Sequence, residues 1–321
     1  SQSAGLLINA AAGVTSTGTL RADGGPLQLQ TTIDSGGGSI EARNGSQVQL
    51  LHGAVIHNAN FSATGAGSLI TTVGGATVTL GGGTVAGPMT IANNSFVRQT
   101  GNLVYNGTLN MASVGNVTDL QVDGLRSITG TATINLSNTQ ANRFVAANGP
   151  GDQLTLGSDV TASGAGQLGA GTALALVNNG SIVASQAAGL LVETSAGVAN
   201  NGVMRADGGP LQFRNVVIDS GSGTIEAVNG SQVQLLNGTV INNANFAASS
   251  GGVITTVGGA TVTLGGGTVS GPMTVANNSF LRLTGDLTYN GALGMASVGN
   301  ATDIQFGGAR TLGGTATITL S

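Results

Sequence analysis

Short runs of alternating apolar and polar residues recur along the whole chain. Between Thr77 and Leu80, for example, threonines alternate with Val78 and Leu80, which is the two-residue period of a strand with one buried face. Turns of Asn and Gly separate these runs, and apolar residues at helical spacing are absent. The pattern therefore predicts an all-β chain built from many short strands.

A period of about 19 to 25 residues organises the short runs. From Asn178 the chain reads NNGSIVASQAAGLLVETSAGVA, then NNGVMRADGGPLQFRNVVIDSGS, then GTIEAVNGSQVQLLNGTVI. Evenly spaced strands with turn signals between them fit one turn of a solenoid per block, with turns about 4.8 Å apart. We therefore predict a right-handed parallel β-helix, or β-solenoid. Asparagine pairs are expected at its corners in left-handed backbone conformations, at Asn93-Asn94, Asn178-Asn179, Asn200-Asn201 and Asn242-Asn243.

A second, tandem period of about 184 residues is superimposed on the first. The segment that starts GLLINAAAG at Gly5 returns as GLLVETSAG at Gly189, with one insertion and one deletion further along. We predict that residues 1–184 form a first complete long repeat and residues 185–321 a second, incomplete one, within one continuous solenoid. Leu80 and Leu264 should then point inward at equivalent turns.

The phase of the long repeat also suggests how the chain continues. Ser1 aligns with Ser185, and the last residues, TATITLS, match TATINLS in the middle of the first repeat. Terminal repeats of solenoids are normally atypical caps. We therefore expect a window on a longer array, extended end to end by further copies, covalent or stacked, with an axial repeat of roughly 40 Å.

Composition excludes several classes of protein. Only 7% of the residues are charged, and all nine basic residues are arginines. The net charge of -4 and an aromatic content of 3% leave neither a basic face nor stacking platforms for nucleic acid. The apolar runs are too short for a membrane span, which needs about twenty consecutive residues. No signal peptide follows Ser1, which fits a processed or internal fragment.

Blocks such as NNGSIVA, GTIEAVNGSQVQLL and ITTVGGATVTLGG resemble the β-helical repeats of large bacterial exoproteins. These include filamentous-haemagglutinin-type adhesins and the passenger domains of autotransporters. The resemblance covers the whole chain and rests on the composition of the turns. It implies an extracellular, elongated stalk or fibre segment at a bacterial cell surface.

The residues that carry chemistry are sparse. The two histidines, His52 and His57, align with Asn237 and Asn242 in the second copy, which argues against catalysis or metal binding by either. GGATVTLGG has the glycines of a calcium-binding repeat without its aspartates. Acidic residues recur singly, as Asp34, Glu41 and Asp119 in the first copy and Asp219, Glu226 and Asp303 in the second. We therefore predict no catalytic residue, no metal site and no cofactor.

Other recurring residues have two interpretations. Arg21 and Asp23 fit an Asp-Gly turn with a weak surface ion pair. Tyr105 is either part of a carbohydrate-binding or lateral-contact face or a solvated residue on an outward strand position. Arg98, Arg126, Arg282, Arg310 and Tyr289 share these alternatives, and core packing is expected for Phe61, Phe96, Phe246 and Phe280.

The sequence as a whole favours a non-enzymatic, extracellular structural protein, a segment of an adhesin stalk or cell-surface filament. Its expected partners are further copies of the same repeat array and surface carbohydrate, with no nucleic acid. The alternative is a carbohydrate-binding or carbohydrate-cleaving β-helix protein, which carboxylates converging in a groove would favour.

Overall fold

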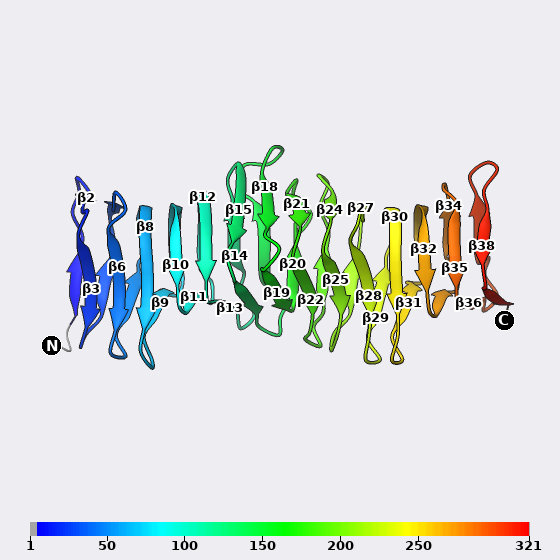
Figure 1. Cartoon of the computed structure of the whole chain (residues 1–321), viewed down its shortest axis with the longest axis horizontal. Coiled ribbons are helices and arrows are strands. Elements are labelled where there is room, and N and C mark those ends of the chain that lie inside the picture. The colour runs from blue at the N-terminus through cyan, green and yellow to red at the C-terminus, as the bar shows by residue number, and fades with distance from the viewer. Residues whose placement is uncertain (1–4, 321) are drawn as a thin grey trace.

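The computed structural model describes residues 5–320 as an elongated coil of parallel strands (Figure 1). All 39 strands of this part belong to one sheet, no helix occurs in it, and the chain makes about 14 turns. The prediction of a parallel β-solenoid is confirmed. Ser1 and Ser321, on which the expectations about the ends partly depend, lie outside the described residues. The strands stack in three hydrogen-bonded ladders, named I, II and III here.

Ladder I begins with the first strand of the described chain. Its strands are β1 (Leu6–Ile8), β4 (Leu27–Leu29), β7 (Gln47–Leu50), β9 (Leu69–Thr72), β11 (Met89–Ala92), β13 (Thr108–Ala112), β16 (Thr133–Leu136), β19 (Thr161–Gly164), β22 (Ser181–Ala184), β25 (Val203–Ala206), β28 (Thr224–Ala227), the ends of β30 (Thr239–Ala248) and β32 (Thr261–Ser270), β35 (Leu287–Asn290) and β38 (Leu312–Gly314).

Ladder II follows ladder I around each turn. Its strands are β2 (Val14–Thr15), β5 (Thr32–Asp34), the beginnings of β8 (Val55–Thr64), β10 (Thr77–Ala86) and β12 (Phe96–Asn106), β14 (Thr118–Val122), β17 (Asn142–Ala146), β20 (Gly166–Leu168), β23 (Leu190–Val192), β26 (Leu211–Phe213), β29 (Gln232–Leu235), β31 (Val253–Thr256), β33 (Met273–Val275), β36 (Ala292–Met295) and β39 (Thr317–Leu320).

Ladder III completes each turn. Its strands are β3 (Thr19–Asp23), β6 (Ser39–Arg43), the ends of β8, β10 and β12, β15 (Leu125–Thr129), β18 (Gln153–Leu156), β21 (Ala175–Asn178), β24 (Val198–Asn200), β27 (Val217–Asp219), the beginnings of β30 and β32, β34 (Phe280–Leu283) and β37 (Asp303–Phe306).

The core is a continuous column of inward side chains. Because side chains alternate across a strand, every second residue of each strand points into the coil and stacks on its partners in the turns before and after. In ladder I one such buried file runs through Leu27, Val48, Ile70, Met89, Leu109, Ile134, Ala162, Ile182, Met204, Ile225, Phe246, Val269 and Tyr289. The file passes through the junction of the two long repeats without a break.

The two copies of the sequence are displaced by one ladder. Strand β3 carries the RAD segment of the first copy and belongs to ladder III, whereas β25 carries that of the second copy and belongs to ladder I. In Figure 1, β3 and β6 of ladder III and β25 and β28 of ladder I lie in the lower half of the view, whereas β18, β21 and β24 of ladder III lie in the upper half.

The length of a turn varies more than the sequence suggests. Gly124 and Asp152 lie one turn apart and are 28 residues apart in sequence. The extra residues form the loop 147–152, which Asp152 closes by accepting hydrogen bonds from the backbone N–H groups of Asn148 at 2.7 Å and Gly149 at 3.2 Å. Most other turns fall within the predicted range because they have no such loop.

The asparagine prediction is right for some corners and wrong for others. Asn94 and Asn243 adopt φ angles of 63° and 53°, as expected for left-handed corners. Asn178 and Asn200 instead lie fully buried at strand ends, where the Nδ2 atom of Asn178 donates to Oδ1 of Asn200 at 2.8 Å. Their side chains point inward and stack through this bond, while Oδ1 of Asn178 has no hydrogen-bond partner, so these pairs are stacked amides rather than left-handed corners.

Candidate functional site: paired corner grooves

Most charged side chains join one turn of the solenoid to the next. Of the ion pairs in residues 5–320, all but Arg43–Glu41 have partners about one turn apart. They are Arg21–Glu41 at 2.9 Å, Arg98–Asp123 at 2.9 Å, Arg143–Asp119 at 2.8 Å, Arg205–Glu226 at 2.7 Å and Arg214–Glu193 at 2.6 Å. The carboxylates of these five pairs are therefore occupied by contacts between turns.

The expected surface pair of Arg21 with Asp23 is not formed. Arg21 reaches Glu41 in the next turn, and Asp23 accepts a hydrogen bond from Nδ2 of Asn44 at 2.9 Å. Arg21 and Asp23 lie two residues apart along one strand. Residues stacked in neighbouring parallel turns lie directly side by side, and their side chains are closer. The axial neighbour is therefore the closer partner.

The two histidines also contact the neighbouring turn. Nδ1 of His52 accepts a hydrogen bond from the backbone N–H of Thr77 at 3.2 Å. In the second copy, Oδ1 of Asn237 accepts the equivalent bond from Thr261 at 3.0 Å. His57 lies over Gly81, where a Cβ atom would overlap its imidazole ring. The amide of Asn237 thus makes the same bond as the imidazole of His52, so the role of this bond is structural.

The acidic residues that recur between the copies lie apart. Asp34 and Asp219 each accept a bond from a backbone N–H two residues later, from Gly36 at 3.2 Å and Gly221 at 3.1 Å. Asp119 is buried and binds Arg143 through two hydrogen bonds of 2.8 Å each. These bonds raise the pKa of the Arg143 guanidinium. In the described part of the chain, no three His, Asp or Glu side chains gather as metal ligands would.

Both expectations for the tyrosines are wrong. Tyr105 and Tyr289 are inward residues of the core, 1% and 0% exposed. The hydroxyl of Tyr105 donates to a backbone carbonyl, that of Thr108 at 3.0 Å, and Tyr289 makes the equivalent bond to Ala292 at 3.0 Å. Burial raises the pKa of Tyr289 to about 12. Two of the four phenylalanines expected in the core, Phe61 and Phe246, are buried, and Phe96 and Phe280 are half-buried.

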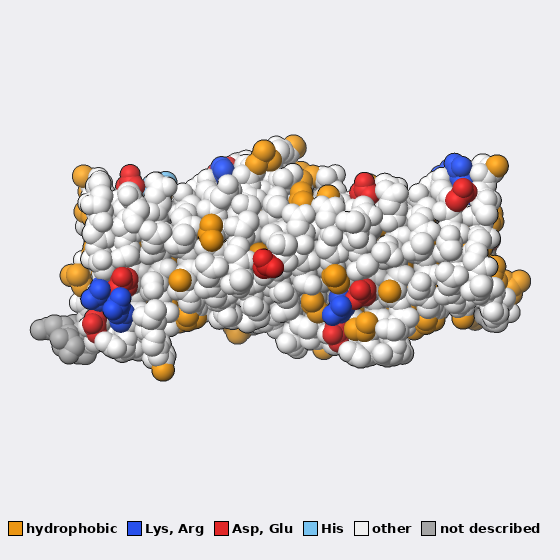
Figure 2. Space-filling view, in the orientation of Figure 1, with side chains coloured by type: hydrophobic (Ala, Val, Ile, Leu, Met, Phe, Trp, Pro, Cys, Tyr) orange, Lys and Arg blue, Asp and Glu red, His pale blue; other side chains and the backbone are white. Residues whose placement is uncertain are grey.

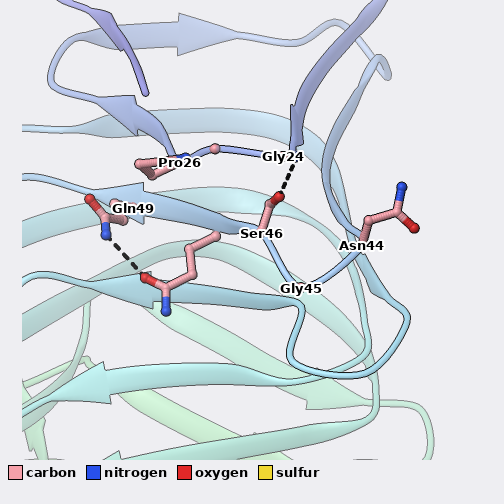
Figure 3. Close-up of a pocket in the computed structure, with 8 residues that line it drawn as sticks. Gly24, Pro26, Asn44, Gly45, Ser46 and Gln49 are labelled. Atoms are coloured by element: carbon pink, nitrogen blue, oxygen red, sulfur yellow. Dashed lines mark hydrogen bonds between the residues drawn. The ribbon is translucent and has the colours of Figure 1, made fainter. Parts of the chain in front are cut away.

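A shallow groove lies at the corner between ladders III and I in the first copy. Its volume is about 360 Å³, and it is lined by Gly24, Gly25, Pro26, Asn44, Gly45, Ser46, Gln47 and Gln49. Two successive turns form it, because the backbone N–H of Gly24 donates to Oγ of Ser46 at 2.7 Å (Figure 3). Figure 3 also shows Asn44 pointing away from Pro26 and Gln49.

Carboxamides follow one side of this groove in an ordered chain. Nε2 of Gln28 donates to Oε1 of Gln49 at 2.9 Å, and Nε2 of Gln49 donates to Oε1 of Gln47 at 3.0 Å. This arrangement leaves the Gln28 oxygen as an acceptor and the Gln47 nitrogen as a donor. The groove therefore presents neutral hydrogen-bonding groups beside the ring of Pro26.

The second copy repeats the groove. It has a volume of about 280 Å³ and is lined by Gly208, Gly209, Pro210, Gly230, Ser231 and Gln232. The equivalent bond from Gly208 to Ser231 measures 2.8 Å, and the amide chain recurs from Gln212 to Gln234 at 2.8 Å and on to Gln232 at 2.9 Å.

Sequence reasoning missed both grooves because GGP and NGSQ look like ordinary turns. A signal was nevertheless present. All six residues that line both grooves are unchanged between the copies, whereas nearby outward positions change, Gln30 to Arg214 and Arg43 to Val228.

In comparisons with known proteins, no family model, curated protein or solved structure matches the chain. Among residues 5–320 there is also no helix long and apolar enough to cross a membrane. The contacts described above are therefore the basis for assigning a function.

Proposed function

We propose that the chain is a segment of an extracellular structural protein, the stalk of an adhesin or a filament at a bacterial cell surface. One observation carries this proposal: the polar side chains that enzymes use for chemistry are used here to join turns. Many of the charged residues are held by partners one turn away, as in the pairs Arg143–Asp119 and Arg205–Glu226.

Pairwise replacement between the copies supports a structural role. In the second copy Glu193 binds Arg214 through bonds of 2.9 and 2.6 Å. In the first copy Asn9 and Gln30 stand at these positions and form a single amide bond of 3.4 Å. Both partners differ, and the axial contact is kept. Maintenance of the stack explains this exchange better than a reaction would.

The continuity of the ladders supports growth by repetition. The inward file of ladder I passes from the first copy into the second with unbroken hydrogen bonding around Ser185, whose N–H donates to the Gly164 carbonyl at 3.2 Å. Nothing in this arrangement limits the number of copies. Further copies, joined end to end, are the proposed partners, and nucleic acid is not among them.

Immunogold labelling of intact cells that produce the protein tests its location. With antibodies raised against this chain, gold particles should decorate extended structures outside the cell envelope. Labelling confined to the cell interior would contradict the proposal. Release of reducing sugars from polysaccharides by the purified chain, abolished when Asp34 and Asp219 are both changed to Asn, would instead favour the carbohydrate-cleaving alternative.

A further inference from the structure

We propose that the two corner grooves are binding sites for a neutral polysaccharide. The grooves lie at Gly24–Pro26 with Asn44–Gln49, and at Gly208–Pro210 with Gly230–Gln232. This inference concerns binding in solution and does not depend on the location of the protein or on filament formation.

The chemistry of the lining points to a neutral, hydroxyl-rich ligand. The first groove contains carboxamides, a serine hydroxyl, backbone groups and a proline ring, but no ionisable side chain. Sugar rings carry hydroxyl groups that both donate and accept hydrogen bonds, together with an apolar C–H face. The Gln47 carboxamide and the Ser46 hydroxyl offer hydrogen-bonding groups, and Pro26 offers the apolar surface.

The second groove shows that the feature belongs to the repeat and not to the end of the described chain. Complete turns of the solenoid lie on both sides of it, because β22 and β28 flank β25 in ladder I. Its volume of about 280 Å³ is close to the lower limit, about 300 Å³, of typical small-molecule pockets. Each groove alone is thus small and open, which predicts weak binding by a single site.

Because the two grooves lie along one edge of the molecule, a polysaccharide chain that binds both has a higher affinity than one groove alone provides. They follow β3 and β6 in the first copy and β25 and β28 in the second, and Figure 1 shows all four strands along the same edge of the molecule. Figure 2 shows a cluster of basic and acidic side chains over each strand pair on one visible face. At about 4.8 Å per turn, the grooves are on the order of 40 Å apart along the axis. One polymer chain can therefore occupy both.

Affinity electrophoresis tests the proposal with the purified chain. Native gels contain one of three soluble neutral polysaccharides, hydroxyethyl cellulose, glucomannan or dextran, and migration is compared with a gel that contains none. The variants are Gln47→Ala, Gln232→Ala and the double variant. Asn135→Ala is the matched control, since Asn135 donates to Asn110 at 3.1 Å in an outward amide pair on ladder I away from both grooves. Circular dichroism confirms that each variant folds.

At least one polysaccharide should retard the unaltered chain and the Asn135→Ala variant equally. Each single variant should bind at least about tenfold more weakly, because it loses the second contact, and the double variant should not be retarded. Raising the salt concentration should leave the retardation unchanged. No retardation by any of the three polymers, equal retardation of the double variant, or loss of retardation in salt would each overturn the proposal.

Discussion

Leu80 and Leu264 stand at the same place in the two copies of the sequence but in different ladders of the solenoid. Both are buried, which confirms that they point inward. Leu80 pairs with Ile56 in ladder II, whereas Leu264 pairs with Ile241 in ladder III. One long repeat thus advances the chain by a whole number of turns plus one ladder. Figure 1 nevertheless shows the equivalent strands β3 and β25 in the same half of the view.

The buried carboxylate of Asp119, which pairs with Arg143, should contribute more to stability than the equivalent carboxylate of Asp303 in the second copy. Changing Asp119 to Asn leaves the Arg143 guanidinium without its carboxylate, and we expect a loss of about 2 kcal/mol in the free energy of unfolding. The matched control is Asp303→Asn, at a less buried position, with an expected loss below about 0.5 kcal/mol. Urea unfolding measures both. Equal losses would contradict the assigned role of the pair.

The glycine at the bend of β10 should not tolerate a side chain. Gly83 has a φ angle of 121°, and a Cβ atom there would overlap the carbonyl oxygen of Ala59 in the preceding turn. Gly83→Ala should cost at least about 2 kcal/mol in unfolding free energy. Gly18→Ala is the control, because a Cβ atom at Gly18 meets no other atom within 4 Å. Similar urea midpoints for the two variants would show that the close packing is not real.

His52 should be replaceable by asparagine at little cost. Since Asn237 accepts the same backbone bond in the second copy, His52→Asn should change the unfolding free energy by less than about 0.5 kcal/mol. His52→Ala removes the acceptor for the Thr77 N–H and should cost about 1 kcal/mol. A larger loss for asparagine than for alanine would refute the structural interpretation.

The two tyrosines should resist ionisation as long as the chain is folded. Burial raises the pKa of Tyr105 far above its ordinary value of 10.0 and that of Tyr289 to about 12. Their neutral forms stabilise the fold fully below pH 10, and this stability is lost as the pH rises through the folded values. Absorbance at the tyrosinate band should therefore stay low at pH 11 and rise with unfolding. A simple titration centred near pH 10 would show that the rings are exposed.

Acid should destabilise the chain. The Arg214 guanidinium lowers the pKa of Glu193, and the Asn243 amide lowers that of Asp219. Carboxylates with a lowered folded pKa stabilise the fold above their unfolded values, near 4.5 for Glu and 3.8 for Asp, and the stability is lost as the pH falls through the folded values. Urea midpoints should fall between pH 5 and pH 3, and less steeply in Glu193→Gln. Identical midpoints at both pH values would contradict this.

The periodicity of the sequence was enough to predict the strands, their parallel stacking and inward apolar residues such as Leu80 and Leu264. Alternation at Val78 and Leu80 determines which face is buried, and it is local. The ladder to which a strand belongs cannot be predicted from the local sequence. It depends on whether the chain turns at a corner or continues through it, and at Gly81 in β10 the strand continues. Tyr105 was misplaced for a related reason: its polar hydroxyl suggests an outward position, and only the structure shows the Thr108 carbonyl that satisfies it inside.

Electron microscopy of the intact, full-length protein tests the central claim most directly. If the chain is a segment of a stalk or filament, the micrographs should show thin fibres in which the ladders continue from copy to copy, with an axial repeat of roughly 40 Å for each long repeat. Compact, isolated particles, with the outer turns covered by loops or a helix, would contradict the account.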